Sequence, residues 1–596
     1  MPAVPLQSHR PMQSAEPEPS DPRAPAPARE PELTARALLF GCAMGVLLAS
    51  GNVYTGLKTG FIDGGSITAA LMGFAFFSAF KRVAGAPFGA LENNIAQTTA
   101  SSAAIMGFAL GVPGPLPALH LMGHDYAGWA LVTWGVALGF IGVLLGGILR
   151  RKLILAEKLP FPTGAATAEV IETMSSSHKT AMYRARLLIA TAVLAMIFAW
   201  FRDGRPSLIP QSTPLAGALL GVSLASLTVG VSWSPLLVST GLLIGFRNAA
   251  SMLIAGFVSW ILLAPRLVRA GIVPSAGFGP CAAWLMWPGV GLLLASSFVP
   301  LVLDWRGLVR SFRDIPMLLR RRRHGEDPGL ATDRFRLAKP LLLVSVVLML
   351  VVGRVALHLP PVITLVSLLL ALVLGNVCAR SAGETDLAPT GAVGTLTQLV
   401  FTGSGNVGSL FAGSITAGVS SQTAQTLWAL RAGNQLKASP NAQLWAQLLG
   451  AVLGAVVSVP VYFVVVKAYG LGTEAMPAAS AFSWKATAEA VRGGLSSMPR
   501  LAPLGGGIGF AIGVILAGLS RGRWGRFVPS PAAMGMATLS PFSLSASVCI
   551  GGIISLFCTR LRPGSEASVM SIAAGGIAGE SVMGVIIAAL IATGLL

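Results

Sequence analysis

Four acidic side chains sit against strongly apolar or glycine-rich flanks, namely Asp63, Glu92, Glu169 and Glu580. Charged groups at membrane depth are costly, so they need partners and often mark a transport path. Glu580 lies in a glycine-rich apolar run, where a buried acid can bind and release a proton. The alternative is a glutamate hydrogen-bonded statically to a neighbouring helix.

Residues 51–60 (GNVYTGLKTG) nearly match the phosphate-binding loop G-x-x-x-x-G-K-[ST]. Leu57 intrudes between Gly56 and Lys58, and the segment follows an apolar run instead of a soluble strand, so we reject nucleotide binding. One interpretation is a helix broken at its glycines, which exposes Lys58 to an anionic group of a substrate. The other is an interfacial lysine that snorkels at a helix end.

Residues 92–102 (ENNIAQTTASS) open another apolar run with many polar side chains. Asn93 and Gln97 share a helical face at i,i+4. So many polar groups need partners, which a solvated cavity can supply. The cavity is the favoured interpretation; the alternative is a capped helix start in which Glu92 complements the helix dipole.

Two other segments predict re-entrant or closely packed helices. Residues 161–169 (FPTGAATAE) are too short to span a membrane, which is typical of a re-entrant half-helix or of a surface helix. In the last apolar run, Gly575 and Gly579 form a G-x-x-x-G step that allows close helix packing.

Metal and nucleophilic chemistry have little support in the sequence. His120 and His124 stand at i,i+4 beside Asp125, but in a proline-rich loop where solvated histidines are the commoner case. The five cysteines are scattered without a C-x-x-C pair. We therefore expect no metal site and no cofactor. No Ser/His/Asp or Cys/His set can be assembled from spacing, which disfavours an intramembrane enzyme.

Composition predicts the elements that must position these residues. The chain has 596 residues, of which 54% are hydrophobic and only 11% charged. Soluble proteins carry about 25% charged residues, so a soluble enzyme, a disulfide scaffold and a nucleic-acid-binding protein are disfavoured. The net charge of +19 comes from basic residues in loops, which suits cytoplasmic loops and anionic lipid.

We therefore predict an all-α polytopic membrane protein with about sixteen transmembrane helices in two related eight-helix halves, some of them re-entrant or broken. The apolar runs centre on 38–57, 64–80, 92–112, 128–149, 187–201, 215–231, 240–263, 281–303, 340–357, 361–378, 390–403, 407–430, 441–467, 502–519, 531–558 and 570–594. The halves are suggested by Ser234-Pro235 and Ser530-Pro531, which are 296 residues apart.

Charge predicts the domain order and the orientation. Residues 1–35 form a disordered cytoplasmic tail, 36–303 the first half, 304–339 a basic cytoplasmic loop and 340–596 the second half. The positive-inside rule places the basic loop in the cytoplasm, and an even number of spans on each side places both termini there too. The expected location is the inner membrane of a bacterium. Three basic pairs fall outside and count against this orientation, namely Arg202/Arg205, Arg266/Arg269 and Arg560/Arg562.

Taken in order, these clusters resemble the oligopeptide transporter (OPT) family in its bacterial and yellow-stripe-like branch. The resemblance runs from the first span to the last. The matching segments are 52–60, 92–101, 161–169, 234–256, 439–450 (SPNAQLWAQLLG), 530–531 and 575–584.

The resemblance implies about sixteen helices and proton-coupled uptake of small peptides or metal–chelator complexes. It suggests substrate-binding and proton-coupling groups on matching positions. For substrate binding these are Asn52, Lys58, Asn93 and Gln97, and for proton coupling they are Glu92, Glu169 and Glu580. Tyr54, Asn94 and Arg431 are further candidates for substrate binding. Residues 429–433 (ALRAG) depart from the family's Asp-Leu-Lys-Thr-Gly pattern, which leaves the substrate open.

These features favour a secondary active importer of small peptides or peptide-like solutes. A transporter of metal chelates is the alternative, and a passive channel is a remote one. The expected partners are the solute, protons and the lipid bilayer, without nucleic acid, and a homodimer is possible.

Overall fold

The structure is a computed structural model that describes residues 31–79, 88–176, 178–303, 309, 338–493, 498–523, 525–562 and 564–596. Most of the predicted tail (1–35) and most of the predicted basic loop (304–339) lie outside the described residues. Both therefore remain predictions.

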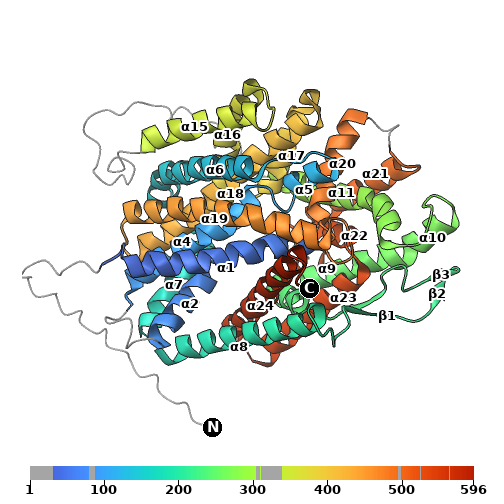
Figure 1. Ribbon diagram of the computed structural model, residues 1–596, viewed down its shortest axis with the longest axis horizontal. Coiled ribbons are helices and arrows are strands. Elements are labelled where there is room, and N and C mark those ends of the chain that lie inside the picture. The colour runs from blue at the N-terminus through green and yellow to red at the C-terminus, as the bar shows by residue number, and fades with distance from the viewer. Residues whose placement is uncertain are drawn as a thin grey trace, which may run out of the picture.

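The described chain consists mostly of helices (Figure 1). Up to residue 303 these are α1 (Ala35–Thr59), α2 (Ser66–Ala79), α4 (Ala90–Ala109), α5 (Pro115–Leu121), α6 (Gly128–Arg150) with the π-helical η1 (Arg151–Ala156), α7 (Pro162–Ser176), α8 (His178–Asp203), α9 (Pro235–Gly256) with the π-helical η2 (Phe257–Leu263), α10 (Ala264–Arg269) and α11 (Phe278–Leu303).

From residue 338 on, the described chain forms a second series of helices. These are α15 (Ala338–Val355), α16 (Pro361–Thr385), α17 (Thr390–Val400) with the 3-10 turn η3 (Thr402–Ser404), α18 (Gly405–Gln435), α19 (Pro440–Tyr469), α20 (Ala479–Gly493), α21 (Ala502–Leu519), the 3-10 turn η5 (Gly525–Phe527), α22 (Pro531–Thr538), α23 (Phe542–Leu561) and α24 (Glu566–Ala592).

Eleven helices among the described residues are long and apolar enough to cross a membrane. They confirm an all-α polytopic membrane protein, whereas sixteen spans and two related halves remain predictions. Five predicted spans are not among the eleven, namely 64–80, 92–112, 215–231, 390–403 and 407–430. The helices α2 and α17 are short, and α4 and α18 are rich in polar side chains.

The predicted span at 215–231 is wrong. The segment forms four short strands, β1 (Ser212–Pro214), β2 (Ala218–Leu219), β3 (Val222–Ser223) and β4 (Gly230–Ser232), in two antiparallel pairs, β1 with β4 and β2 with β3. In the pair of β1 and β4, Thr213 lies opposite Val231. Gly217 and Gly221 adopt positive φ angles of 132° and 81°, which favour turns and interrupt a helix. The span was predicted from the apolar residues of this segment alone, whereas its glycines allow the turns of two hairpins.

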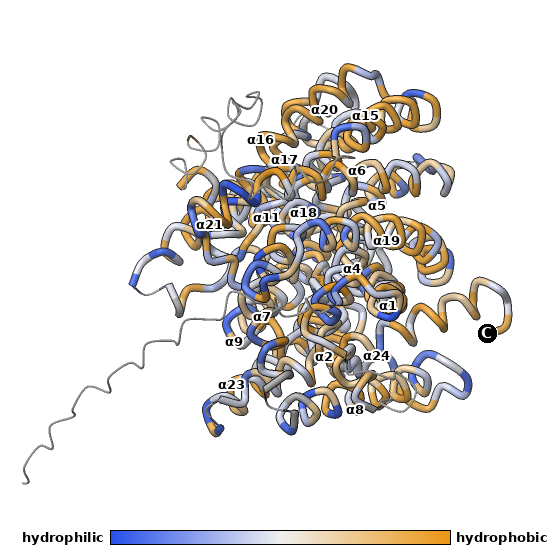
Figure 2. The backbone as a smooth tube through the Cα atoms, turned by 90° about the vertical axis from the view of Figure 1, so that its left-hand side faces the viewer, coloured by the Kyte–Doolittle hydropathy of each residue, from blue (hydrophilic) through white to orange (hydrophobic). Residues whose placement is uncertain are grey.

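The most polar long helices occupy the interior of the bundle. The helix α4 packs against α1, α18 and α19, and α18 packs against α6, α7, α16 and α17. Figure 1 shows α8 along one edge of the bundle and α15 and α16 along the opposite edge. Figure 2 shows paler colours along α4 and α18 than along α15 or α19. Outer helices expose aliphatic side chains instead, including Leu343 at 66% and Leu194 at 65%. Polar side chains inside and apolar side chains outside are the reverse of the arrangement in a soluble protein, and they suit a helix bundle surrounded by lipid.

Three helices start with the same serine–proline cap. Ser234, Ser439 and Ser530 accept hydrogen bonds from the backbone N–H three residues later, and proline occupies the first helical position each time. Serine at the N-cap and proline at N1 are favoured because they satisfy, or lack, the unpaired N–H groups of a helix start. The repeated serine–proline motif at Ser234 and Ser530 is therefore a helix N-cap, and the same cap occurs a third time at Ser439.

The predicted G-x-x-x-G packing of the last helix is confirmed. A Cβ atom on Gly579 would lie 2.1 Å from the Ala192 carbonyl oxygen, and one on Gly575 would lie 2.3 Å from that of Leu188. Without side chains at these two positions, α24 and α8 approach backbone to backbone.

We expect Gly579→Val to separate α24 from α8 and to lower the melting temperature of the purified protein by several degrees. Overpacking of this kind costs about 1–3 kcal/mol. Gly518→Val is the matched control, because a Cβ atom at Gly518 meets nothing within 4 Å. Equal melting temperatures for the two variants in detergent would contradict the close approach.

Candidate functional site

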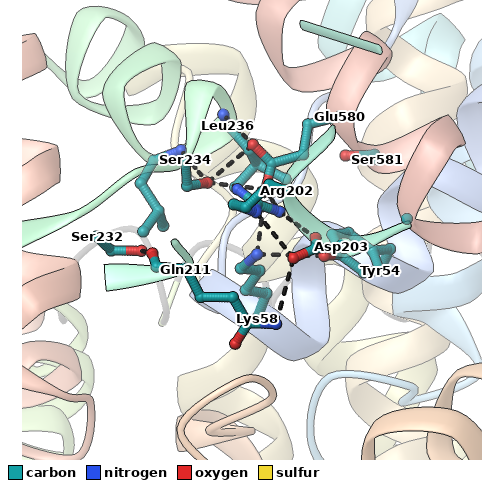
Figure 3. A network of polar contacts seen from close by, with 12 residues as sticks. Tyr54, Lys58, Arg202, Asp203, Gln211, Ser232, Ser234, Leu236, Glu580 and Ser581 are labelled. Carbon is teal, nitrogen blue, oxygen red and sulfur yellow. Dashed lines mark hydrogen bonds and ion pairs between the residues drawn. The ribbon is translucent and has the colours of Figure 1, made fainter. Parts of the chain in front are cut away.

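The carboxylate of Glu580 on α24 is fully buried and surrounded by hydrogen-bond donors (Figure 3). Its Oε1 atom accepts from Lys58 at 3.1 Å and from Arg202 at 3.0 Å. The Ser234 hydroxyl lies 2.8 and 2.9 Å from the two carboxylate oxygens, and the backbone N–H of Leu236 donates to Oε2 at 2.8 Å. Two cations and the N-terminus of α9 therefore compensate one carboxylate.

Arg202 also pairs with the neighbouring Asp203, so two cations face two anions. We call Lys58, Arg202, Asp203 and Glu580 the ion network. Its members come from α1, the end of α8 and α24, and α9 adds the capping serine. Equal numbers of charges and the donors around them make this buried arrangement tolerable.

One side of the ion network faces a small polar vestibule of about 70 Å³. The vestibule is lined by Lys58, Arg202 and Asp203 together with Tyr54, Gln211, Ser212, Ser232, Tyr469, Glu474, Ala475 and Ser543. The Lys58 side chain is 12% exposed, whereas Glu580 is 0% exposed. A solute in the vestibule therefore reaches the lysine before it reaches the carboxylate. Burial raises the pKa of the vestibule residue Glu474, which lies in the loop after α19.

A second polar assembly lies between α4, α18 and α19. We call it the amide cluster, and its side chains are between 0 and 1% exposed: Asn94, Gln97, Gln422, Gln425, Gln443 and Gln447. Gln97 donates to Asn94 Oδ1 at 3.0 Å. Gln422 donates to Ser102 Oγ at 2.8 Å, and Ser102 in turn donates to the backbone carbonyl of Gln447 at 2.7 Å.

The amide cluster has more hydrogen-bonding capacity than it uses. Within the described part of the chain, four of its buried polar atoms have no hydrogen-bond partner: Asn94 Nδ2, Gln97 Oε1, Gln422 Oε1 and Gln447 Nε2. Leaving a buried polar atom unpaired costs about 1–3 kcal/mol, so each of these atoms calls for an explanation. They include both donors and acceptors, as the backbone of a peptide does.

Three predicted substrate-binding residues have local partners. Asn52 bonds the Asp63 backbone and donates to the Ala104 carbonyl at 3.0 Å. Tyr54 is buried and its hydroxyl accepts from Lys58 at 3.1 Å. Asn93 donates to the Ala70 carbonyl at 3.2 Å, while its Oδ1 atom has no partner among the described residues.

Other predicted site residues lie away from both assemblies. Glu92 caps α4 and pairs with Arg36 at 2.5 Å, as in the capped-helix alternative. Glu169 is exposed on α7, and Arg431 donates to the Pro160 carbonyl at 3.2 Å. Their roles in coupling and binding remain predictions.

The surface histidine has an ordinary partner. His120 lies 2.5 Å from Asp125, at side-chain exposures of 39% and 70%. Among the residues that the structure describes, no group of three or more His, Cys, Asp or Glu side chains comes together as metal ligands do.

Several members of these two assemblies were not predicted from the sequence. Arg202 and Asp203 looked like loop charges, because Glu580, which pairs with Arg202, is 378 residues away in the sequence. Gln422 and Gln425 lie inside an apolar run, and amides in such a run were a usable signal. Gln443 and Gln447 lie in the segment 439–450 that carries the family resemblance.

Comparisons with known proteins find relatives over nearly the whole chain. The model of the family "OPT oligopeptide transporter protein" matches residues 32–591. A putative oligopeptide transporter of Saccharomyces cerevisiae, YGL114W, is 24% identical over 93% of this chain and 95% of its own length. The probable metal-nicotianamine transporter YSL8 of Arabidopsis thaliana is 26% identical over 93% and 86%. A putative oligopeptide transporter of Haemophilus influenzae is 24% identical over 91% and 92%.

Proposed function

Because this chain belongs to the OPT family of oligopeptide transporters, we propose that it imports small oligopeptides or peptide-like solutes by proton-coupled secondary active transport. The family and the relatives support membrane transport without catalysis. Peptide selectivity and proton coupling are our proposal.

The observation that carries the peptide proposal is the amide cluster. A peptide backbone presents N–H donors and C=O acceptors in alternation. Inside a membrane, its hydrogen bonds can be made only by protein groups that include both donors and acceptors. The unpaired amide atoms of Asn94, Gln97, Gln422 and Gln447 offer both. A solute that binds there replaces the hydrogen bonds to water that it loses on entry.

The ion network supports proton coupling. With Glu580 ionised, Lys58 is held at 3.1 Å from it. Protonation of Glu580 removes that attraction and frees the lysine, which borders the vestibule, to bind the carboxylate of an arriving solute. Proton and solute then bind together, and a rocking motion of the helices exposes both to the cytoplasm. Cytoplasmic termini, a bacterial inner membrane and a homodimer remain predictions.

Metal–chelator complexes are the second candidate substrate class. Several relatives are named metal-nicotianamine transporters. Lys58 and Arg202 near the vestibule suit a chelator that is rich in carboxylates.

Uptake into proteoliposomes tests the proposal. Labelled di- to tetrapeptides and an iron–chelator complex are offered with and without an inward proton gradient. We expect peptides to accumulate above the outside concentration and the accumulation to collapse when the gradient is dissipated. Accumulation of the iron–chelator complex alone would show that the substrates are metal–chelator complexes. Equilibration without accumulation would indicate a channel.

A further inference from the structure

Glu474 is a charged residue of the vestibule that the proposed mechanism leaves unused. It lies in the loop between α19 and α20, and its carboxylate forms no hydrogen bond or ion pair with any residue that the structure describes. Glu474 is exposed to solvent, whereas the side chain of Lys58 in the same vestibule is only 12% exposed. A solute that arrives from solvent therefore meets the carboxylate of Glu474 before it meets Lys58.

The loop holds Glu474 against the end of α1, which carries the lysine of the ion network. The hydroxyl of Thr473 accepts a hydrogen bond from the backbone N–H of Met476 at 3.0 Å, which closes a turn around Glu474. The backbone N–H of Ala478 donates to the carbonyl of Leu57, the residue before that lysine, at 3.0 Å. The backbone on both sides of Glu474 is therefore tied down beside the ion network.

Glu474 gives the vestibule and the ion network an excess of one negative charge. Within the ion network two cations pair with two anions, so these four charges balance (Figure 3). Glu474 is a further anion, and the described wall of the vestibule holds no other lysine, arginine or histidine to balance it. Partial burial raises the pKa of Glu474, because no nearby cation stabilises its ionised form. A cationic group of a solute would supply the missing charge.

The wall around Glu474 suits an ammonium group. Such a group donates up to three hydrogen bonds, so it needs several acceptors. Besides the carboxylate of Glu474, the wall includes the hydroxyl groups of Tyr469, Ser212 and Ser543. The hydroxyl of Tyr469 donates its proton to the Gly584 carbonyl at 3.2 Å, which leaves its oxygen able to accept. The aromatic ring of the same tyrosine also attracts a cation.

We propose that Glu474 binds the free amino terminus of the transported peptide and makes the vestibule selective for peptides whose amino end is unmodified. The inference rests on the proposed function and deepens it. In that function, protonation of Glu580 frees Lys58 for the carboxylate of the solute; Glu474 now supplies the contact for the ammonium group. Once Glu580 is protonated, two cations and two anions remain around the vestibule, which matches a peptide with one charge of each sign and no net charge.

Binding to the purified full-length chain tests the inference without a proton gradient. Trialanine and N-acetyl-trialanine compete with radiolabelled trialanine at about pH 6.5, below the usual pKa of an amino terminus, which is about 8. Acetylation removes the positive charge of that terminus. Because a hydrogen bond to a charged group is worth about tenfold or more in affinity, we expect the wild type to bind trialanine about tenfold more tightly than N-acetyl-trialanine. Glu474→Gln should bind the two peptides alike.

Three comparisons make this result specific. Glu474→Asp keeps the negative charge and should keep most of the preference for trialanine. Glu489→Gln is the matched control, because Glu489 pairs with Lys485 on α20 outside the vestibule, and it should keep the whole preference. Glu474→Gln should bind N-acetyl-trialanine as tightly as the wild type does, which shows that this variant is folded.

The outcomes separate this inference from the proposed function. Equal affinities of the wild type for trialanine and N-acetyl-trialanine would overturn the inference and leave peptide transport intact. A Glu474→Gln variant that keeps the tenfold preference would overturn it as well, because the selectivity would then come from another group. If the wild type neither binds nor accumulates any peptide, the proposed function fails and the inference fails with it.

Discussion

Glu580→Gln is expected to abolish gradient-driven accumulation of solute. Glutamine keeps the shape of the side chain but cannot carry a proton between two states, and it leaves Lys58 and Arg202 facing only Asp203. Uptake should fall to the level of equilibration at every external pH. Measurement of accumulation ratios between pH 5.5 and 8 checks this result. Accumulation that stays fully proton-dependent would remove Glu580 from the mechanism.

Stability must be separated from function in that variant, because removal of one member of a buried ion pair costs about 3–5 kcal/mol. The double variant Lys58→Met with Glu580→Gln removes one charge of each sign. We expect it to regain most of the melting temperature lost by Glu580→Gln and to remain unable to accumulate solute. Recovery of both properties together would show that the single variant was merely unfolded.

The second large effect is expected in the amide cluster. Gln97→Leu and Gln447→Leu remove buried amide atoms that lack partners, at nearly constant volume. Gln447→Leu should be at least as stable as the wild type, because the nitrogen it removes is unpaired and Gln422 keeps its hydrogen bond to Ser102. Gln97→Leu also leaves Asn94 Oδ1 without a donor, so it should lose about 1–3 kcal/mol of stability. Peptide uptake should nevertheless fall by about tenfold or more, as each lost hydrogen bond to a solute costs about 1–3 kcal/mol.

Gln398→Leu is the matched control for these variants. Gln398 on α17 is 1% exposed and also has an unpaired Oε1 atom, but its amide nitrogen donates to the Trp484 carbonyl, outside the amide cluster. Its replacement should leave uptake unchanged. If all three leucine variants transport peptides at the wild-type rate, the amide cluster is not the binding site.

Much of the fold was predictable because membrane helices are long and apolar. The run predicted at 128–149 is α6, and the one at 361–378 lies within α16. The error at 215–231 arose because hydropathy ignores turn chemistry, and Gly217, Gly221 and Gly230 there favour hairpins.

The candidate site was predictable only in part, because its pairings join distant segments. Lys58 and Glu580 were both singled out, yet only the fold brings them within 3.1 Å across 522 residues. Gln422 and Ser102 are 320 residues apart. Local spacing identifies side chains that need partners, whereas packing decides which partners they receive.

Whether solute and proton move together can be measured as a change of pH inside the vesicle. Proteoliposomes that contain a pH-sensitive dye are held at zero membrane potential, and an unlabelled tripeptide is added outside at equal pH. With proton coupling, we expect internal acidification that begins with the addition of the peptide, scales with its uptake and is absent in Glu580→Gln. Peptide entry at the same rate without acidification would contradict proton coupling.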